Sequence, residues 1–315
     1  MSALHVYAIP LRTRFRNVDV REGVLVHGAA GWGEFSPFRE YGDAEAAAWW
    51  RAAREAADEG WPPPVREWIP VNATVPAVSP ANVAGVLERF PGCTTAKVKV
   101  AAAGQTSAED EERLRAVREA LGPAGKIRID ANGAWEPDRA ITLLHRYDRA
   151  AGGLEYAEQP CRTVEDLAAV RRKADVPIAA DESIRRTGDP LRVAALRAAD
   201  VAVLKVQPLG GVLACLRIAE QIALPVVVSS ALETSVGIAA GVALAAALPE
   251  LPYACGLATV GLLERDVVDD PLVAVDGSLP VRRPVPSSQT LDAVRADGPT
   301  EAWWTDRVTR VQLRS

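Results

Sequence analysis

Two lysines lie two positions apart in a segment of small apolar residues, TTAKVKVAAA, at residues 94–103. Because side chains alternate between the two faces of a β-strand, Lys97 and Lys99 would leave the strand on the same side. Lysine can lose its proton when its pKa is lowered, whereas arginine cannot, and only five of the 36 basic residues are lysine. Two amines that point the same way therefore predict acid–base chemistry.

Polar residues end five later strand-like segments. They follow one another at intervals of 23 to 28 residues, the length of a strand–helix repeat, and are Asp130, Glu158, Asp181, Lys205 and Ser229. In a parallel barrel the carboxyl ends of the strands meet on one rim, so we expect these side chains to converge. Three carboxylates at one rim would repel one another unless a cation neutralised them. Oxygen ligands without histidine suit Mg²⁺, so the charge balance predicts this metal.

Amines beside such a metal site indicate proton transfer. A substrate carboxylate bound to a divalent cation has an acidified α-proton, and the cation stabilises the enediolate that forms when this proton leaves. A lysine can be the base only if its pKa falls from about 10.4 towards neutrality, which burial and a neighbouring positive charge both favour. The second lysine of the pair would supply that charge. Lys205, several strands further on, would approach the substrate from the opposite side.

Each of these residues also has an ordinary structural explanation. An aspartate at the end of a strand often caps a helix or begins a turn, and Glu158 could lie in a surface loop. Two lysines in alternation are typical of a half-exposed antiparallel strand. The surroundings favour the functional interpretation, because helices cover the outside of a parallel barrel and the lysines would then face the barrel axis.

The elements that must position these residues form a repeated strand–helix pattern from about residue 95 to 260. Segments rich in β-branched residues predict strands at 96–100, 126–132, 153–160, 176–183, 201–208, 225–231 and 253–258. Helical stretches lie between them, at 108–121, 135–150, 163–174, 189–199 and 212–222. Such a repeat predicts an α/β fold, a modified (β/α)8 or TIM-like barrel whose eighth strand is degenerate.

The two ends of the chain lie outside this repeat. Residues 1–90 combine strand-like segments with an alanine-rich helix from Asp43 to Asp58, and they predict an α+β capping domain. Residues 91–280 would form the barrel. Residues 281–315, which contain two adjacent tryptophans, would pack back on the cap.

The composition argues against several other classes of protein. With 36 basic and 41 acidic residues and no block of like charge, we expect neither a nucleic-acid partner nor a membrane partner. The longest apolar run, Val236 to Leu248, is shorter than a membrane span. The N-terminus lacks a signal-peptide pattern and the four cysteines form no CxxC pair, so we expect a cytoplasmic protein without a disulfide framework. A monomer is the expected oligomeric state.

The segments KVK, RIDANGAW, EYAEQP, AADES, VLKVQPLGG and SSALETSVG occur in this order along the chain. Together they resemble the muconate-lactonising branch of the enolase superfamily, over nearly the whole length. Within that branch, the short chain and the segment GWGEFSPF resemble enzymes of menaquinone biosynthesis that dehydrate 2-succinyl-6-hydroxy-2,4-cyclohexadiene-1-carboxylate to o-succinylbenzoate. The resemblance implies a hydro-lyase that acts on a small-molecule carboxylate by syn elimination through an enediolate.

The resemblance also implies roles for individual residues. Lys99 would be the acid and base, Lys97 would support it electrostatically, and Lys205 would stabilise the enediolate. The other implied residues are the ligands of Mg²⁺, or of Mn²⁺ as its substitute (Asp130, Glu158, Asp181), their hydrogen-bond partners (Asn132, Glu182) and substrate-binding residues (Ser229, Ser230, Gly210, Gly211). Cap loops around residues 12–21 and 35–42 would close over the substrate, where Arg12, Arg14, Arg16 or Arg21 could pair with a carboxylate.

Three other functions remain open. A racemase of N-acylamino acids or a dipeptide epimerase of the same superfamily would use the same metal site, with Lys99 and Lys205 as opposed acid and base. A Schiff-base aldolase could also have a lysine at the end of a barrel strand. A barrel that binds a metabolite without catalysis is the last alternative, although arginine would serve simple binding as well as lysine does.

Overall fold

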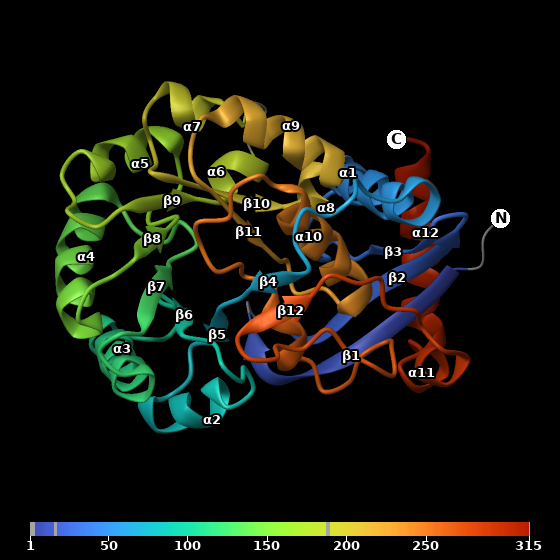
Figure 1. The fold of residues 1–315 in the computed structure, drawn as a ribbon, viewed down its shortest axis with the longest axis horizontal. Coiled ribbons are helices and arrows are strands. Elements are labelled where there is room, and N and C mark those ends of the chain that lie inside the picture. Colours follow the sequence, from blue (N-terminus) through green and yellow to red (C-terminus); the bar gives the residue numbers. More distant parts are fainter. Residues whose placement is uncertain (1–3, 16–17, 187–189, 315) are drawn as a thin grey trace.

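A computed structural model describes residues 4–15, 18–186 and 190–314 of the chain. Its strands form an antiparallel three-stranded sheet, a parallel seven-stranded sheet and a two-stranded sheet (Figure 1). The three-stranded sheet lies on one side of the molecule in Figure 1, and the seven-stranded sheet curls through the other side. The two-stranded sheet pairs β4 (Trp68–Pro70) with β12 (Ser278–Pro280).

The parallel sheet positions most of the predicted site residues. Its order follows the chain: β5 (Ala73–Val75), β6 (Thr95–Lys99), β7 (Lys126–Asp130), β8 (Tyr156–Glu158), β9 (Ile178–Ala180), β10 (Val201–Lys205) and β11 (Val226–Ser229). The connecting helices are α2 (Val83–Leu87), α3 (Ser107–Leu121), α4 (Pro137–Ala151), α5 (Val164–Arg171), α6 (Glu182–Arg185), α7 (Arg192–Ala195), α8 (Val206–Leu209), α9 (Val212–Ile222) and α10 (Ser235–Ala247). Parallel strands with helices around them confirm the predicted modified TIM-like barrel (Figure 1).

One predicted strand of the barrel is wrong. The segment 253–258 makes only single bridges, between Cys255 and Val71 and between Gly256 and Ser229. The backbone N–H of Gly256 donates to the carbonyl of Val228 at 2.8 Å, and that of Asn72 to the carbonyl of Cys255 at 3.0 Å. The segment therefore closes the barrel between β11 and the residues that lead into β5.

The sequence pattern does not predict β5, because three residues between Asn72 and Pro76 are too few for a period-two signal. β5 pairs with β6 in parallel, so the barrel sheet begins before residue 90. The division of the chain into domains stays a prediction.

Local sequence signals account for the helix ends. Thr106 and Glu109 form a capping box at the start of α3, and α4 begins at Pro137 and ends at Gly152 in the left-handed conformation. The helix predicted at 189–199 is reduced to α7, and its first residue, Asp189, lies outside the described residues. Among the described residues, no helix has the length and apolar character that a membrane span requires.

The three-stranded sheet consists of β1 (Leu4–Phe15), β2 (Val18–Gly28) and β3 (Gly31–Phe35). It packs against α1 (Asp43–Arg54), which continues as a π-helix (Glu55–Glu59), and against α12 (Gly298–Gln312) near the C-terminus. Between α11 (Ser288–Ala293) and α12, the carbonyl of Val294 accepts a hydrogen bond from the N–H of Ala8 at 2.9 Å. α1 also packs against α8, so this part of the molecule is fixed to the barrel near β10.

Candidate active site

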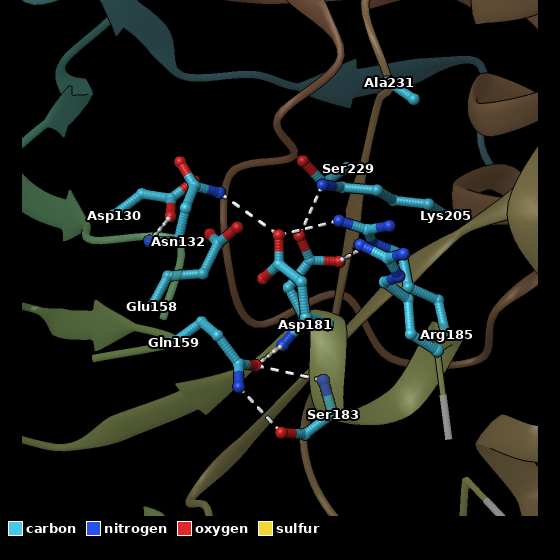
Figure 2. A network of polar contacts seen from close by, with 12 residues as sticks. Asp130, Asn132, Glu158, Gln159, Asp181, Ser183, Arg185, Lys205, Ser229 and Ala231 are labelled. Carbon is cyan, nitrogen blue, oxygen red and sulfur yellow. Dashed lines mark hydrogen bonds and ion pairs between the residues drawn. The ribbon is translucent and has the colours of Figure 1, made fainter. Parts of the chain in front are cut away.

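Strand register brings the predicted residues together at the carboxyl end of the parallel sheet. Lys99 pairs with Asp130, and Asp130 pairs with Glu158, across β6, β7 and β8. Lys205 pairs with Ser229 across β10 and β11. Asp181 directly follows β9, and Figure 2 shows its side chain and those of Asp130, Glu158 and Lys205 reaching toward a common space.

Each lysine of the site lies against a carboxylate. Nζ of Lys97 is 3.0 Å from Oε2 of Glu158 and 3.8 Å from Oδ2 of Asp130. Nζ of Lys99 contacts Oδ2 of Asp130, and Nζ of Lys205 lies 2.6 Å from Oδ2 of Asp181. The three carboxylates are fully buried, so these amines are the charges that balance them.

The carboxylates and amines change one another's proton affinity. Burial and the neighbouring carboxylate of Asp130 raise the pKa of Glu158 to about 7. Burial alone would raise the pKa of Asp130, but the ammonium groups of Lys99 and Lys97 lower it well below its usual range. Burial alone would lower the pKa of Lys97, but Glu158 and Asp130 outweigh burial and raise it. The raised pKa keeps Lys97 positively charged beside Lys99.

Asn132 and Glu182 connect two of these ion pairs. Oδ1 of Asn132 accepts a hydrogen bond from Nζ of Lys99 at 2.8 Å, and the backbone N–H of Asn132 donates to Oδ1 of Asp130 at 3.0 Å. Nδ2 of Asn132 donates to Oε1 of Glu182 at 3.2 Å. Asn132 thus lies beside Asp130 (Figure 2), and Glu182 is joined to it by this hydrogen bond.

Arg185 belongs to the same charge cluster, although the sequence analysis did not select it. Its Nε lies 2.9 Å from Oδ1 of Asp181, and its Nη2 lies 2.7 Å from Oε1 of Glu182. Nη1 donates to the hydroxyl of Tyr41, which comes from the cap side, at 3.0 Å. The only sequence signal was its position four residues after Asp181 at the start of a helix, a spacing that allows an ion pair.

Gln159 holds the backbone around Asp181 and was also missed. Its Oε1 accepts hydrogen bonds from the backbone N–H groups of Asp181 at 3.0 Å and Ser183 at 3.1 Å, and its Nε2 donates to Oγ of Ser183 at 2.7 Å (Figure 2). Gln159 itself has a left-handed φ of 43°. A non-glycine residue in this conformation next to Glu158 is consistent with a backbone that is shaped for the site.

The donor set fits a divalent cation. Three buried carboxylates follow neighbouring strands, and Oε2 of Glu182 is a buried oxygen without a hydrogen-bond partner. Carboxylate oxygens are the ligands that Mg²⁺ prefers. Within the described residues, no three His, Cys, Asp or Glu side chains lie close enough together to form a ligand shell, and the amines of Lys97, Lys99 and Lys205 contact oxygens of the three carboxylates.

A cavity borders these charged groups. Lys97, Lys99 and Lys205 line it from the barrel, and Phe15 and Phe38 line it from the cap side. The loop that follows β11 forms another wall, with Ser229, Ser230, Ala231 and Leu232. Amines beside the rings of Phe15 and Phe38 suit a small anionic ligand with a hydrocarbon body.

Two of the four predicted substrate-binding residues line the cavity. Ser229 and Ser230 line the cavity, where Oγ of Ser229 lies 3.4 Å from Nζ of Lys97 and Oγ of Ser230 lies 2.8 Å from Oγ1 of Thr259. Gly210 and Gly211 do not line it. They lie against α1 and the π-helix, where a Cβ on Gly211 would come within 2.6 Å of Oε2 of Glu55.

The four cap arginines also differ in position. Nε of Arg12 donates to the carbonyl of Leu263 at 2.9 Å, and Arg14 is exposed near Asp19. Arg21 is buried and donates to the loop after β11. Arg16 lies outside the described residues.

The fold and the site define a class of protein. An α+β cap packs on a modified barrel, and the barrel presents carboxylates and lysines on successive strand ends. The family model described as "Enolase C-terminal domain-like" matches residues 83–286, and the model described as "Enolase N-terminal domain-like" matches residues 6–57. The chain belongs to the enolase superfamily.

Close relatives define the family more narrowly. An o-succinylbenzoate synthase of Thermobifida fusca is 66% identical over 291 residues, which cover 92% of this chain and 91% of the relative. One of Mycolicibacterium smegmatis is 56% identical over 308 residues, or 98% of this chain and 94% of the relative. Within the superfamily, the chain belongs to the o-succinylbenzoate synthase family.

Solved structures support the fold alone, because their sequences are distant. The muconate lactonizing enzyme of Pseudomonas fluorescens has a TM-score of 0.81 at 21% identity, with 94% of this chain and 98% of that chain covered. The L-Ala-D/L-Glu epimerase of Bacillus subtilis has a TM-score of 0.76 at 24% identity, with 91% and 97% covered.

Proposed function

We propose that the chain catalyses the dehydration of 2-succinyl-6-hydroxy-2,4-cyclohexadiene-1-carboxylate to o-succinylbenzoate, a step of menaquinone biosynthesis. Relatives named o-succinylbenzoate synthase, 54% to 66% identical over nearly the whole chain, support this function. The observation that carries the chemistry is the position of the amines. Lys97 and Lys99 lie on β6 and Lys205 lies on β10, and the three strands between them bring the carboxylates.

The charges of the site suit a divalent metal and a dianionic substrate. The four acidic side chains of Asp130, Glu158, Asp181 and Glu182 are matched in number by the four basic side chains of Lys97, Lys99, Lys205 and Arg185. A divalent cation adds two positive charges, and the ring carboxylate and succinyl carboxylate of the substrate add two negative charges. Enzymes of this family generally depend on a divalent metal.

Mg²⁺ is the metal that we propose, with Asp130, Glu158 and Asp181 as its ligands and Mn²⁺ as a substitute. When bound, the cation would polarise the ring carboxylate and stabilise the charge that builds up on it. Asn132 and Glu182 would orient the ligands through the hydrogen bonds already described.

Lys99 would move the proton in both halves of the reaction. Its amine takes the proton α to the ring carboxylate, and the same amine then returns this proton to the departing hydroxyl group, so that one water leaves and the ring becomes aromatic. Both transfers occur on one face, which gives syn elimination. Lys97 keeps positive charge beside Lys99, and Lys205 holds the developing negative charge from the other side of the cavity. Ser229 and Ser230 line the cavity and would contact the substrate.

The direct test is turnover of the cyclohexadiene carboxylate with Mg²⁺, measured for the wild type and for Lys99→Arg and Lys205→Arg. Arginine keeps the charge but cannot exchange its proton, so both variants should fold and lose nearly all turnover. Lys126→Arg is the matched control, because Lys126 is exposed at the start of β7, and it should keep wild-type turnover. Wild-type activity in Lys99→Arg would contradict the assigned base.

The arrangement of amines also suits racemisation, since Lys99 and Lys205 approach the cavity from different strands. Incubation with an N-succinyl amino acid in D₂O separates the two functions. Exchange of the α-proton with inversion, at a rate comparable to dehydration, would favour the racemase. We expect dehydration to be much the faster reaction.

The substrate is a small molecule, and we propose the cytoplasm as the compartment of the enzyme. Cys93, Cys161, Cys215 and Cys255 are all free thiols, as is usual in a reducing compartment. A monomer remains our proposal for the oligomeric state. Size-exclusion chromatography with light scattering tests it.

A further inference from the structure

Arg21, on β2 of the cap, is a buried cation whose hydrogen bonds all lead to backbone carbonyl groups. Only 2% of its surface is exposed. Nε donates to the carbonyl of Leu232 at 2.8 Å, Nη1 to that of Glu22 at 3.0 Å, and Nη2 to those of Ala231 at 3.3 Å and Ser36. One guanidinium group therefore connects β2, the end of β3 and the loop that follows β11.

The loop that Arg21 holds is a wall of the cavity and has an unusual backbone. Ser230, Ala231 and Leu232 line the cavity directly above the lysines. Leu232 has a left-handed φ of 68°, a conformation that costs a branched, bulky residue free energy unless its surroundings hold it. The loop is fixed on its other side by Glu233, whose Oε2 accepts a hydrogen bond from the N–H of Ala231 at 2.6 Å.

Arg21 also supports a second wall of the cavity. Its guanidinium carbon lies 4.7 Å from the centroid of the Phe38 ring, the geometry of a cation–π contact. Phe38 lines the cavity from the cap side, whereas the lysines line it from the barrel. The aromatic rings of Tyr41 and Trp49 pack on Phe38 at 5.8 Å and 6.4 Å, so the ring is held between them and Arg21.

The surroundings of Arg21 anchor the same loop to the barrel. Glu34 on β3 accepts hydrogen bonds from the backbone N–H groups of Thr234 at 3.2 Å and Gly237 at 3.0 Å, at the start of α10. Oγ of Ser36 donates to Oε1 of Glu34 at 2.7 Å, and the carbonyl of Ser36 accepts from Arg21. Glu34 thus fixes the helix end of the loop, and Arg21 fixes the part that borders the cavity.

We propose that Arg21 is a positioning residue that sets how tightly the cavity fits its substrate, by holding the backbone of Ala231 and Leu232 and the ring of Phe38 against the bound molecule. This inference rests on the proposed function. Among the described residues, the hydrogen bonds of Arg21 go to backbone carbonyls and not to the carboxylates or lysines of the active site, so its contribution is to substrate binding and not to proton transfer.

The test is Arg21→Lys, with KM and kcat measured separately. A lysine keeps the charge, but its single ammonium group cannot reach three segments at once or stack flat on a ring. We expect KM to rise about tenfold or more while kcat changes less than about threefold, because binding is lost equally in the ground and transition states. Arg66→Lys is the matched control, since Arg66 donates to the carbonyls of Ala245 and Leu248 at the far end of α10. It should keep wild-type KM.

A second variant keeps the inference testable if Arg21→Lys does not fold. Phe38→Leu removes one wall and leaves Arg21 in place, and we expect the same rise in KM at nearly constant kcat. The dissociation constant of o-succinylbenzoate, followed by tryptophan fluorescence, should rise with KM in both variants. Wild-type KM and product affinity in the folded variants would overturn the inference, whereas absence of dehydration by the wild type would contradict the proposed function.

Discussion

Asn132 contacts both an amine and a carboxylate of the site, and its backbone is left-handed. Its side chain accepts from Lys99 and donates to Glu182, while its φ is 48°. Asparagine adopts this conformation more easily than most residues do, and its amide at the same time orients the amine that is the proposed base. Asn132 therefore allows the backbone to turn and also orients the side chain of Lys99.

These two contributions can be separated by comparing Asn132→Gly with Asn132→Ala. Both variants lose the amide, so we expect turnover to fall about tenfold to a hundredfold in each, because the position of Lys99 is no longer fixed. Only alanine resists the left-handed φ, so Asn132→Ala should in addition lose about 1 kcal/mol of unfolding free energy. Steady-state kinetics and urea unfolding measure the two effects. Equal stability of both variants, or full activity in Asn132→Gly, would contradict this division.

Glu233 gives the protein a stability that depends on pH. Burial and the nearby carboxylate of Glu34 raise the pKa of Glu233 to about 7, while Arg21 opposes this rise. The folded protein then holds the proton more tightly than the unfolded chain, so stability falls as the pH rises from about 4.5 to about 7. Above that range, the buried and ionised carboxylate of Glu233 lowers the free energy of unfolding by a constant amount.

Glu233→Gln removes this titration and keeps an oxygen that can accept from Ala231. We expect the difference in unfolding free energy between the variant and the wild type to favour the variant more at pH 8 than at pH 5, by on the order of 1 to 3 kcal/mol. Thermal unfolding at the two pH values measures the difference. Glu250→Gln, at an exposed position, is the control and should show no such dependence on pH. If the difference in unfolding free energy between Glu233→Gln and the wild type is the same at both pH values, the carboxyl of Glu233 does not titrate between them.

Residues of the site could be predicted from the sequence where they lie at the ends of the repeated strands. The lysines and carboxylates end successive strands, and the register brought them together. Arg185 was not selected, and Arg21 was only one of four cap arginines considered as partners of a substrate carboxylate, because 31 of the 36 basic residues are arginine and neither stands out by type. Their contacts join segments far apart in the chain, and no local pattern encodes that proximity.

At the scale of secondary-structure elements, the Gly210–Gly211 turn lies against the cap side of the molecule. Gly211 has a φ of 126° and lies directly beside the carboxylate of Glu55 from the π-helix after α1. That carboxylate accepts hydrogen bonds from the backbone N–H groups of Val212 at 2.6 Å and Leu213 at 3.0 Å. The turn therefore lets a residue of the cap side cap the N-terminus of α9, just after the strand that carries Lys205.

Glu55→Gln tests the strength of this contact. An amide has only one oxygen, and its NH₂ group would face one of the two N–H donors, so one of them loses its partner. We expect a loss of about 1 to 2 kcal/mol in unfolding free energy, the usual range for a lost helix cap. Glu59→Gln is the matched control in the same π-helix, where the side chain is exposed. Similar unfolding curves for the two variants would mean that the cap contributes nothing.

The elements that the sequence analysis predicted wrongly or missed show no regular alternation of apolar and polar residues. The segment 253–258 has the composition of a strand, yet it makes isolated bridges, because it has to span from Val71 to Ser229 rather than run along one neighbour. β5 consists of three residues, and a strand of that length is recognised only from its pairing with β6. The closure of a barrel depends on such distant pairings, which a single sequence does not specify locally.

At the scale of the whole molecule, the site is a cluster of four acidic and four basic side chains between the barrel and the cap. The lysines occupy the carboxylate oxygens that a metal would need. Asp130, Glu158 and Asp181 would hold a divalent cation beside the cavity that the three lysines line.

Removal of the metal should consequently abolish turnover and also lower stability. We expect enzyme treated with EDTA to be inactive, and Mg²⁺ to restore activity and raise the unfolding free energy by about 2.7 kcal/mol at a hundred times its dissociation constant, since only the folded chain holds the three carboxylates together. Asp181→Asn should fold but respond to Mg²⁺ only at much higher concentration, whereas Asp175→Asn, a matched change at a position whose carboxyl lies outside the charge cluster, should respond like the wild type. Calorimetric titration of each protein with Mg²⁺ follows binding without turnover. Full activity in EDTA, or an unfolding temperature that does not change when Mg²⁺ is added, would contradict the proposed metal site. The lysines alone would then balance the charge of these carboxylates.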